Sequence, residues 1–304
     1  MNTEISVFAP AKVNLFLEVL SKRDDGYHNL ATLFAKLSLG DDIKISAQNA
    51  PQTSIELKIK GPFGAGLKAD KTNLAYKAAK AFFDYFNIKA ACQIRLEKNI
   101  PLGAGLGGGS SDAAAVLRGL CALYNIEINS KRKKDLLAIA AKLGADIPVF
   151  LEDGTFYLAG GIGEILTEVK SKITSPCIII IYPDEASDTA LAYKELSLSS
   201  DEEIKTRLPS LDKLTDALKS CAPLSQWQSF LYNKLEGSVL KRLQACAKAK
   251  EALHSLGAHG TIMSGSGSCV LGLVEDKTAA GEMVKQLGAD YKTVFLTHFW
   301  RTKV

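Results

Sequence analysis

The sequence predicts an α+β protein with two domains, and three observations lead to this expectation. The first part of the chain is rich in short apolar stretches typical of strands, whereas the later part alternates such stretches with helical patterns. Helices that alternate with strands usually pack on a sheet. The chain has 304 residues, 47% of them hydrophobic, which is enough for one large or two medium domains. A glycine-rich turn at 160–163 falls where the pattern changes, so we expect domains at residues 1–165 and 166–304.

The first domain is expected to begin with strands. Its apolar stretches are separated by short polar segments, of which residues 23–28 form a clear turn. Residues 92–96 alternate apolar and polar side chains, as in a strand with one buried face. The predicted strands cover residues 5–10, 13–20, 30–39, 42–46, 55–59, 92–96, 154–159 and 165–169.

Three helices are predicted among these strands. Asn73 is expected to cap the first, whose apolar residues recur at helical spacing as far as Tyr85. The second begins at two serines after a glycine-rich segment and ends near Tyr124. The third is expected to be capped by Ser130 and closed by Gly144.

The second domain is expected to alternate strands and helices. Its first strand is a continuous apolar run, and two further strands close the chain. The predicted strands are residues 177–182, 269–274 and 291–299, and the predicted helices are residues 187–196, 201–220, 233–256 and 277–287.

The residues between Pro101 and Asp112 form the most informative segment of the chain. They read Pro-Leu-Gly-Ala-Gly-Leu-Gly-Gly-Gly-Ser-Ser-Asp, with five glycines in seven residues just before a predicted helix. Glycine lets the backbone approach a ligand closely, and a helix N-terminus offers unpaired N–H groups and the positive end of the helix dipole. A flexible turn is the alternative, but the strong helix formers of residues 113–117 follow directly. We therefore expect the segment to bind a nucleotide polyphosphate.

Comparison with known phosphate-binding patterns shows which classes of loop this segment does not match. A Walker A loop requires a lysine after its glycines, whereas Gly108 is followed by Gly109 and Ser110, so this loop is excluded. A dinucleotide-binding pattern is met only weakly by Gly103, Gly105 and Gly108, because no long apolar strand follows the helix. The protein-kinase pattern fails, since the chain has no His-Arg-Asp and no Asp-Phe-Gly.

A second segment of small residues, Met263 to Ser268, precedes the strand predicted at residues 269–274. Alone it could be a tight connection. Together with the glycine-rich segment, it could wall the other side of one phosphate site, with each domain contributing a loop.

Composition limits the partners and the compartment. The net charge of +4 is spread along the chain, which argues against nucleic acid or a membrane as the main partner. The basic run at 131–134 fits a solvated helix turn. The N-terminus resembles no secretory leader, and no uninterrupted apolar stretch of about 18 residues occurs. No cluster of His, Cys, Asp and Glu has metal-ligand spacing, so no protein metal site is expected.

The cysteines carry no Cys-x-x-Cys spacing and lie in apolar patterns, so we expect reduced core residues in a cytoplasmic protein. They are Cys92, Cys121, Cys177, Cys221, Cys246 and Cys269.

Three motifs, in the right order along the chain, resemble those of the GHMP small-molecule kinases. They are Pro10 to Leu15, Pro101 to Asp112, and Met263 to Gly267. The resemblance spans the whole chain. It implies an N-terminal domain like ribosomal protein S5 domain 2, a ferredoxin-like C-terminal domain, and an active site in the cleft between them.

Shorter motifs are similar to one branch of this family. That branch phosphorylates the 2-hydroxyl of a diphosphocytidyl methylerythritol in non-mevalonate isoprenoid biosynthesis. Two positions depart from its usual pattern, because Lys234 stands in place of an acid and Asp188 interrupts a Ser-Thr pair. The matching motifs are Gly26-Tyr27-His28, Gly144 to Pro148, Gly161 to Glu164, and Thr189 to Tyr193.

The resemblance implies ATP as co-substrate, with Mg²⁺ carried by its phosphates, and it assigns Lys12 and Asp146 as catalytic residues. Asp146 would be the base that takes the hydroxyl proton, and Lys12 would favour its ionised form and lie near the transferring phosphoryl group. The alternatives are a helix cap for Asp146 and an ordinary surface lysine for Lys12. The implied ATP-binding residues are Pro101, Leu102, Gly103, Ala104, Gly105, Leu106, Gly107, Gly108, Gly109, Ser110 and Ser111.

On the substrate side, the resemblance places Tyr27 and Tyr193 where aromatic rings stack on cytosine, and His28 where a side chain reads the base edge. Asn14, Lys98 and Thr189 would line the remainder of the small-molecule substrate. Without the motifs, each could equally be an ordinary core or surface residue. No role is expected for His254, His259 and His298.

Two other functions stay open. The chain could be another GHMP kinase, acting on homoserine, mevalonate or a sugar, but those kinases lack the combined Gly-Tyr-His and Thr-x-x-x-Tyr motifs. It could also be a catalytically silent nucleotide-binding sensor on the same fold, although Lys12 and Asp146 are both present. For the assembly, we expect a monomer or a weak homodimer.

Overall fold

The computed structural model describes residues 4–174 and 176–301, which fall into two compact units. The first strands contribute residues to both units. This division follows the contacts between residues, and it does not coincide with the domain boundary predicted between residues 165 and 166. That boundary stays a prediction. Unit 1 comprises the chain up to Ala11 with residues 40–101 and 107–153, and unit 2 comprises residues 12–39, 102–106 and those from Gly154 onward.

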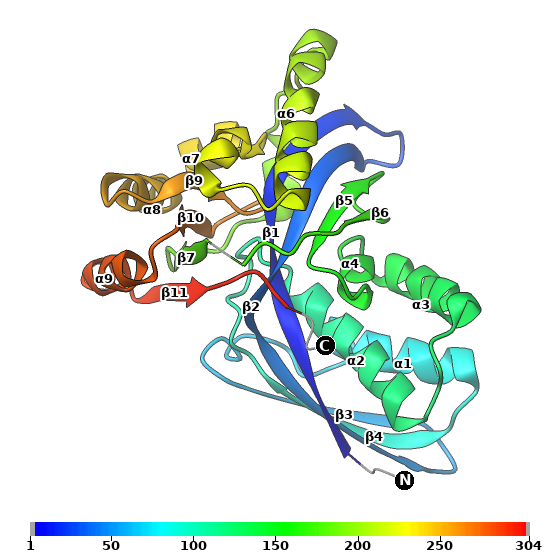
Figure 1. The fold of residues 1–304 in the computed structure, drawn as a ribbon. Helices are drawn as coiled ribbons and strands as arrows, with labels where there is room; N and C mark the ends of the chain where they lie inside the picture. The colour runs from blue at the N-terminus through cyan, green and yellow to red at the C-terminus, as the bar shows by residue number, and fades with distance from the viewer. Residues whose placement is uncertain (1–3, 175, 302–304) are drawn as a thin grey trace. The chain divides into compact units, whose positions relative to one another are not determined.

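The chain opens with two long strands, β1 (Glu4–Lys22) and β2 (His28–Asn49) (Figure 1). The sequence predicted four shorter strands here. The polar turn predicted at residues 23–28 is confirmed, whereas the breaks predicted at residues 11–12 and 40–41 were wrong. A side chain at Gly40 would collide with the ring of Phe8, so close packing requires this glycine. Asp41 follows it inside β2 because its carboxylate accepts hydrogen bonds from backbone N–H groups and is thereby satisfied although it is buried.

In unit 1, the end of β2 pairs antiparallel with β4 (Ala90–Glu97), and β4 pairs in parallel with β3 (Ser54–Lys60). The three predicted helices are confirmed, and a short helix that the sequence did not predict follows them (Figure 1). They are α1 (Leu74–Phe86), α2 (Gly108–Leu123), α3 (Ser130–Leu143) and the short α4 (Ile147–Leu151).

Side-chain caps fix where two of these helices begin. The Asn73 side chain accepts a hydrogen bond from the N–H of Ala75 at 2.9 Å, as predicted. Helix α3 is capped by Asn129, which accepts from the N–H of Arg132, so the predicted cap at Ser130 was wrong by one residue.

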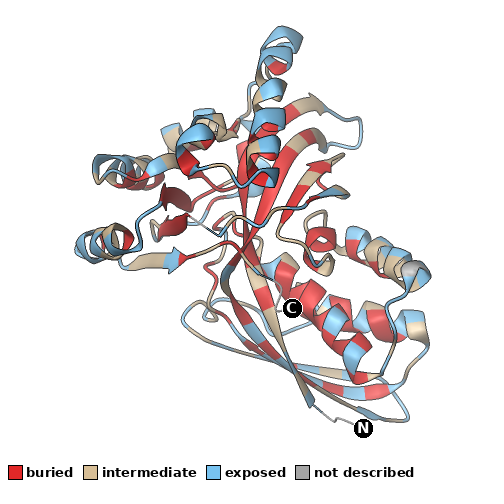
Figure 2. Ribbon diagram, in the orientation of Figure 1, coloured by how far each residue is buried: buried red, intermediate tan, exposed pale blue. Residues whose placement is uncertain are grey.

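Helix α2 is the most buried of the three long helices of unit 1, and Figure 2 shows it largely red. Residues 113–117 are all buried, which explains the run of small and apolar side chains there. An added Cβ at Gly119 would lie 2.5 Å from Cδ1 of Ile45 and 2.9 Å from Cγ2 of Val7. The helix therefore approaches the sheet closely at this glycine.

Unit 2 contains parts of two sheets. In the first, β1 pairs in parallel with the short β8 (Tyr232–Asn233), and the start of β2 pairs antiparallel with β5 (Phe156–Gly160). Strand β5 in turn pairs with β6 (Ile165–Val169), as an antiparallel hairpin closed by the predicted glycine turn.

The second sheet is fully antiparallel and has the order β11-β7-β10-β9. Counted along the chain, the first and third strands occupy the middle of the sheet, as in a ferredoxin-like arrangement. The sequence predicted three of these strands and missed β9. The strands are β7 (Cys177–Tyr182), β9 (His259–Met263), β10 (Val270–Val274) and β11 (Thr293–Thr297).

The helix predicted over residues 233–256 is broken in the structure. Asn233 belongs to β8, and α7 (Glu236–Arg242) and α8 (Gln244–Ser255) are separated by Leu243, whose φ of −97° and ψ of 84° are not helical. The periodicity was real, because apolar side chains of both helices pack into the same core cluster as β7 and β10. The other helices of unit 2 are α5 (Thr189–Lys194), α6 (Asp201–Lys219), α9 (Lys277–Leu287), η1 (Leu224–Gln226) and η2 (Gln228–Phe230).

All six cysteines have free thiols, and five of them are buried. Burial raises the pKa of Cys92 to about 12 and that of Cys121 to about 11, so these thiols are unreactive near neutral pH. The prediction was wrong for Cys221, which is exposed at the end of α6 with a positive φ of 54°. Within residues 4–174 and 176–301, no helix combines the length and the apolar character needed to cross a membrane.

Candidate active site

The backbone of the glycine-rich segment adopts a conformation that other residues rarely reach. Gly103, Gly105 and Gly107 have φ angles of 59°, 74° and 69°, in the left-handed region. A side chain at these positions would strain the backbone. The repeated glycines are therefore a requirement of the loop's path.

The carbonyl groups of residues 103–106 all accept hydrogen bonds within unit 2. Among the described residues, none of the N–H groups of residues 103–107 donates to a backbone carbonyl. The segment thus turns its acceptors toward the protein and keeps its donors available, which is the arrangement that binds an anion. The carbonyls of Gly103, Ala104, Gly105 and Leu106 accept from the N–H of Ser187, the N–H of Cys269, the hydroxyl of Ser264 and the N–H of Lys12, respectively, at 2.8–3.1 Å.

Helix α2 begins directly after this segment. Its N-cap residue is Gly107, which has no side chain to satisfy the first N–H groups of the helix. Among the described residues, the buried Ser111 Oγ and Asp112 Oδ1 have no hydrogen-bond partner. The first turn of α2 therefore offers spare backbone and side-chain polar groups, as well as the positive end of the helix dipole.

Lys12 and Asn14 lie on β1 in unit 2 and are buried, with 4% and 2% of their surface exposed. The Lys12 Nζ donates to Asn14 Oδ1 at 2.8 Å and lies 5.1 Å from the centre of the Phe34 ring. Asn14 is held in turn, because its Nδ2 donates to Thr32 Oγ1 at 2.8 Å. The alternative of an ordinary surface lysine does not apply, since the Lys12 ammonium is fixed inside the protein.

The second small-residue segment lies against the first within unit 2. Gly265 has a φ of 53°, and an added Cβ there would lie 3.2 Å from Asn14 Oδ1, 3.3 Å from the Gly105 carbonyl oxygen and 3.4 Å from Lys12 Nζ. The structure therefore brings together Lys12, Asn14 and both segments of small residues.

Two residues that sequence reasoning missed hold this second segment in place. Asn233 Nδ2 donates to the carbonyl oxygens of Met263 and Gly265, each at 2.7 Å. Glu236 Oε1 accepts from the N–H of Met263 at 2.6 Å, and its other oxygen pairs with Lys250. No sequence pattern indicated these contacts, because they join residues 14 to 32 positions apart in the chain.

Both residues that depart from the family pattern make local hydrogen bonds. Asp188 is the N-cap residue of α5, where its side chain accepts from the N–H of Leu191 at 3.1 Å. Lys234 joins β1 through its backbone, since its N–H donates to the carbonyl of Leu17 at 2.8 Å. Neither departure disturbs the contacts described above.

Asp146 lies in unit 1 at the N-cap position of α4 and is half-buried. Its side chain makes no capping hydrogen bond, and its φ and ψ of −84° and −9° are helical rather than extended. The alternative role of a helix cap is therefore not supported. Its pairing with Lys12 stays a prediction.

Lys98, also in unit 1, is 1% exposed. Its Nζ donates to Asp112 Oδ2 at 2.7 Å and to Asp41 Oδ2. Burial raises the pKa of Asp112 to about 8, against the lowering effect of Lys98 and with the added repulsion of Asp41. The predicted part of Lys98 in lining the substrate stays a prediction.

The residues expected at the cytosine are only partly together. His28 and Tyr193 stack with ring centres 5.1 Å apart and an interplanar angle of 26°, whereas Tyr27 is 58% exposed. Burial, together with the charge of Lys22, lowers the pKa of His28 and favours the neutral imidazole. Thr189 is joined to the second segment by a 2.8 Å hydroxyl contact with Ser266.

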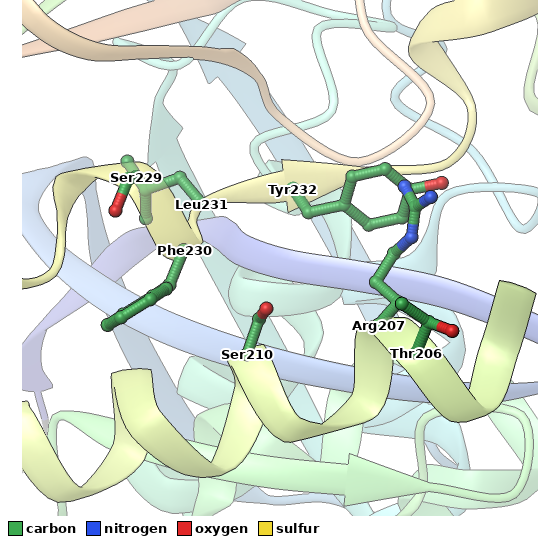
Figure 3. A pocket seen from close by; sticks show the side chains of 7 residues that line it. All are labelled: Thr206, Arg207, Ser210, Ser229, Phe230, Leu231 and Tyr232. Atoms are coloured by element: carbon green, nitrogen blue, oxygen red, sulfur yellow. The ribbon is translucent and has the colours of Figure 1, made fainter.

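A separate pocket of about 260 Å³ lies beside α6 and β8 in unit 2 (Figure 3). Arg207 lies across the ring of Tyr232, with its guanidinium carbon 3.8 Å from the ring centre (Figure 3). It also forms an ion pair with the buried Glu18 at 3.6 Å. No predicted site residue lines it. Among the described residues, no group of three or more His, Cys, Asp or Glu side chains could hold a metal ion.

Comparison with known proteins provides evidence that is independent of the structure. A sequence model of the GHMP kinases N terminal domain matches residues 73–154, and one of the GHMP kinases C terminal domain matches residues 211–293. A 4-diphosphocytidyl-2-C-methyl-D-erythritol kinase from Prosthecochloris aestuarii is 38% identical over 292 residues, covering 96% of both chains. One from Citrifermentans bemidjiense is 37% identical and covers 91% of this chain and 92% of the relative.

Solved structures agree. A 4-(cytidine 5'-diphospho)-2C-methyl-D-erythritol kinase matches with a TM-score of 0.75 and 34% identity, covering 98% of this chain and 100% of that one. Homoserine kinase from Cytophaga hutchinsonii matches with a TM-score of 0.77, covering 98% of this chain and 96% of that one, but at 21% identity. This second likeness concerns the fold alone, because proteins of one fold can act on different substrates.

The φ of Gly107 generates a first prediction. Gly107→Val should strain the start of α2 and block close approach of a phosphate, so the Kd for a non-hydrolysable ATP analogue should rise by about tenfold or more. Isothermal calorimetry measures this. Gly257→Val is the matched control, since Gly257 has a φ of 91° in an exposed turn, and it should leave the Kd unchanged. Equal affinity in a folded Gly107→Val protein would contradict the assignment.

The pKa of Asp112 generates a second prediction. Its folded pKa of about 8 lies above the ordinary 3.8, so between about pH 5 and 8 the folded protein holds a proton that the unfolded chain has lost. This group therefore lowers the free energy of unfolding as the pH rises, by at most about 1.4 kcal/mol per pH unit. Urea unfolding at pH 5, 6.5 and 8 should show a shallower fall for Asp112→Asn than for the wild type. Parallel curves would refute the raised pKa.

Proposed function

Since the chain belongs to the GHMP kinases, and within them to the 4-diphosphocytidyl-2-C-methyl-D-erythritol kinases, we propose that it transfers the γ-phosphoryl group of ATP to the 2-hydroxyl of that alcohol. The reaction yields the 2-phosphate and ADP and serves non-mevalonate isoprenoid biosynthesis. The two curated relatives described above, at 37–38% identity, are both 4-diphosphocytidyl-2-C-methyl-D-erythritol kinases, whereas a homoserine and a mevalonate kinase match at 21% and 14% identity. This difference favours the cytidyl substrate over the other alcohols.

The observation that carries the proposal is the backbone of residues 103–106. Its carbonyls are bound within unit 2 and its N–H groups are available, next to the first turn of α2. Phosphoryl transfer depends mainly on holding the phosphates in line and neutralising their charge. We propose that residues 101–111 bind the triphosphate of ATP, which brings Mg²⁺ with it as part of the substrate.

Lys12 is suited to stabilise the charge of the transferring group. Its ammonium is held by Asn14 and lies close to Gly105 and Gly265, so it needs no reorganisation during the reaction. The buried position strengthens its electrostatic effect, because screening by water is weak there. Asn14 acts here by orienting Lys12, in addition to its predicted contact with the substrate.

Asp146 is proposed as the base that orients the hydroxyl and accepts its proton while the oxygen attacks the γ-phosphorus. The support is its half-buried carboxylate, which does not cap α4.

His28 and Tyr193 are proposed to hold the cytosine, with Tyr27 completing the site from the exposed turn after β1. A neutral imidazole has one donor and one acceptor, which suits the edge of a base. Because His28 stacks on Tyr193, cytosine would exchange that stack for its own contacts with both rings. Thr189 would line the remainder of the substrate, and its hydroxyl contact with Ser266 fixes it beside the second small-residue segment.

The proposed compartment is the cytoplasm and the proposed assembly a monomer or weak homodimer. The free thiols support a reducing environment.

The role of Asp146 is tested by Asp146→Asn. If Asp146 handles the hydroxyl proton, kcat should fall by about 10²–10⁴-fold, while the Kd for ATP stays within about twofold. A coupled ADP-release assay and calorimetry measure the two quantities. Asp216→Asn, at an exposed carboxylate of α6, is the control and should behave as the wild type. Turnover of Asp146→Asn within threefold of the wild type would exclude the role.

The cytosine site is tested by side-chain removal and by substrate choice. Tyr193→Ala should weaken binding of the cytidyl substrate by about 1–3 kcal/mol, the contribution of one base–aromatic stack, and should leave ATP affinity unchanged. His28→Ala should lose most activity, and the wild type should reject the uridine analogue, because unmatched polar groups at a base edge are costly. His254→Ala, at an exposed residue of α8, is the control. Equal turnover of homoserine, mevalonate or plain methylerythritol phosphate would replace this proposal with a more general GHMP kinase.

A further inference from the structure

Three charged side chains meet in the interior of unit 1. Asp41, Lys98 and Asp112 are 0%, 1% and 3% exposed, and we call them the Lys98 cluster. The ammonium of Lys98 donates to a carboxylate oxygen of each aspartate. Charged side chains are rarely buried so completely unless their pairing serves a purpose.

The cluster joins the two ends of the glycine-rich segment. At the entrance, Asp41 Oδ1 accepts from the N–H groups of Asn99 and Ile100, at 2.5 and 2.8 Å, just before Pro101. At the exit, Asp112 lies in the first turn of α2, and an added Cβ at Gly108 would lie 2.9 Å from Lys98 Nζ. One ammonium group therefore ties the backbone that enters the segment to the helix that leaves it.

The distance between these ends decides how the N–H groups of the segment converge. A loop fixed before binding loses less conformational freedom when it orders around a ligand, and its affinity is higher for that reason. The hydrogen bonds of residues 103–106 fix the middle of the segment, but they do not involve its ends. The Lys98 cluster supplies the missing restraint.

The number of charges also fits a restraint of this kind. One ammonium faces two carboxylates, and the proton held by Asp112 up to about pH 8 brings the cluster close to neutrality. Loss of the ammonium would leave the buried Asp41 carboxylate without its cation and would remove the group that joins β2 to α2. We therefore expect the cluster to lose its restraining effect when Lys98 is removed, and to keep it when a neutral hydrogen-bonding group replaces Asp112.

We propose that Asp41, Lys98 and Asp112 are positioning residues that set the geometry of the segment at 101–111 and thereby its affinity for ATP. The proposal rests on the proposed kinase function. It places Lys98 behind the segment, where its ammonium is bound by two carboxylates, and so favours an indirect role over the contact with the alcohol substrate that the family resemblance implies.

The test compares ATP affinity, acceptor affinity and stability in the full chain. Lys98→Met should raise the Kd for a non-hydrolysable ATP analogue by about tenfold or more, while the KM for the diphosphocytidyl alcohol stays within about twofold. Binding is measured by calorimetry at a temperature where circular dichroism shows each variant to be folded. Lys80→Met, which breaks an exposed ion pair of α1 in the same unit, is the matched control and should change neither value.

A second pair of variants keeps the test decisive if Lys98→Met does not fold. Asp112→Asn retains an oxygen that can accept from Lys98 and should bind the ATP analogue within about threefold of the wild type, whereas Asp112→Ala should weaken binding by about tenfold. A merely structural role would lower the melting temperature of both variants without separating their ATP affinities.

The possible outcomes distinguish a failure of the positioning role from a failure of the kinase function. If the wild type binds and turns over ATP, and folded Lys98→Met or Asp112→Ala binds the analogue as tightly as the wild type, the positioning role is overturned and the kinase function stands. If a variant raises the KM for the alcohol substrate but not the Kd for the analogue, Lys98 belongs to the acceptor side and the positioning role is likewise overturned. If the wild type neither binds the analogue nor releases ADP, the kinase function falls, and the positioning role falls with it.

Discussion

Hydrogen bonds to the carbonyl groups of residues 103–106 determine which way this stretch of backbone faces. A peptide group that turns its carbonyl toward the protein turns its N–H away from it, so four bound carbonyls orient several donors at once. The donors of these bonds come from β1, from the segment before α5 and from the loop between β9 and β10. The precision of the candidate site therefore depends on how well those elements are held.

The loop between β9 and β10 is held by buried polar side chains. Asn233 uses both its amide hydrogens on two carbonyls of the loop, and its own oxygen accepts from the N–H of Leu235. A buried amide with satisfied groups permits few alternative positions, whereas an apolar contact tolerates sliding. The same loop contributes Ser264 and Gly265 to the surroundings of Lys12, so Asn233 helps to fix the environment of this buried ammonium from a distance.

The fold alone does not identify the substrate. Homoserine kinase shares the fold with a TM-score of 0.77, slightly above the 0.75 of the cytidyl-substrate kinase, although its sequence identity is only 21% against 34%. Proteins of one fold can act on different substrates through a few side chains, and the proposed pair here is His28 and Tyr193, whose rings stack on each other.

The amino-acid sequence by itself determined the features that depend on near neighbours in the chain. Helical periodicity and the Asn73 cap located α1, and glycines at alternate positions marked a backbone in the left-handed region, where we expect an anion to bind. The motifs also identified Lys12 and Asp146 as candidate catalytic residues, because each motif is a short continuous segment.

Only the tertiary structure decided the features whose partners are far apart in sequence. Gly40-Asp41 has the composition of a turn, yet it continues a strand. The Asp41 carboxylate accepts hydrogen bonds from residues that follow it by 57, 58 and 59 positions in the chain. The helix predicted from Asn233 onward starts later, because the Asn233 amide is used 30 and 32 residues downstream. Lys98 reads as an ordinary lysine at a strand end, and its two carboxylate partners are known only from the fold. The physical reason is the same in each case: burial removes water as an alternative partner, so a distant polar group decides the local conformation.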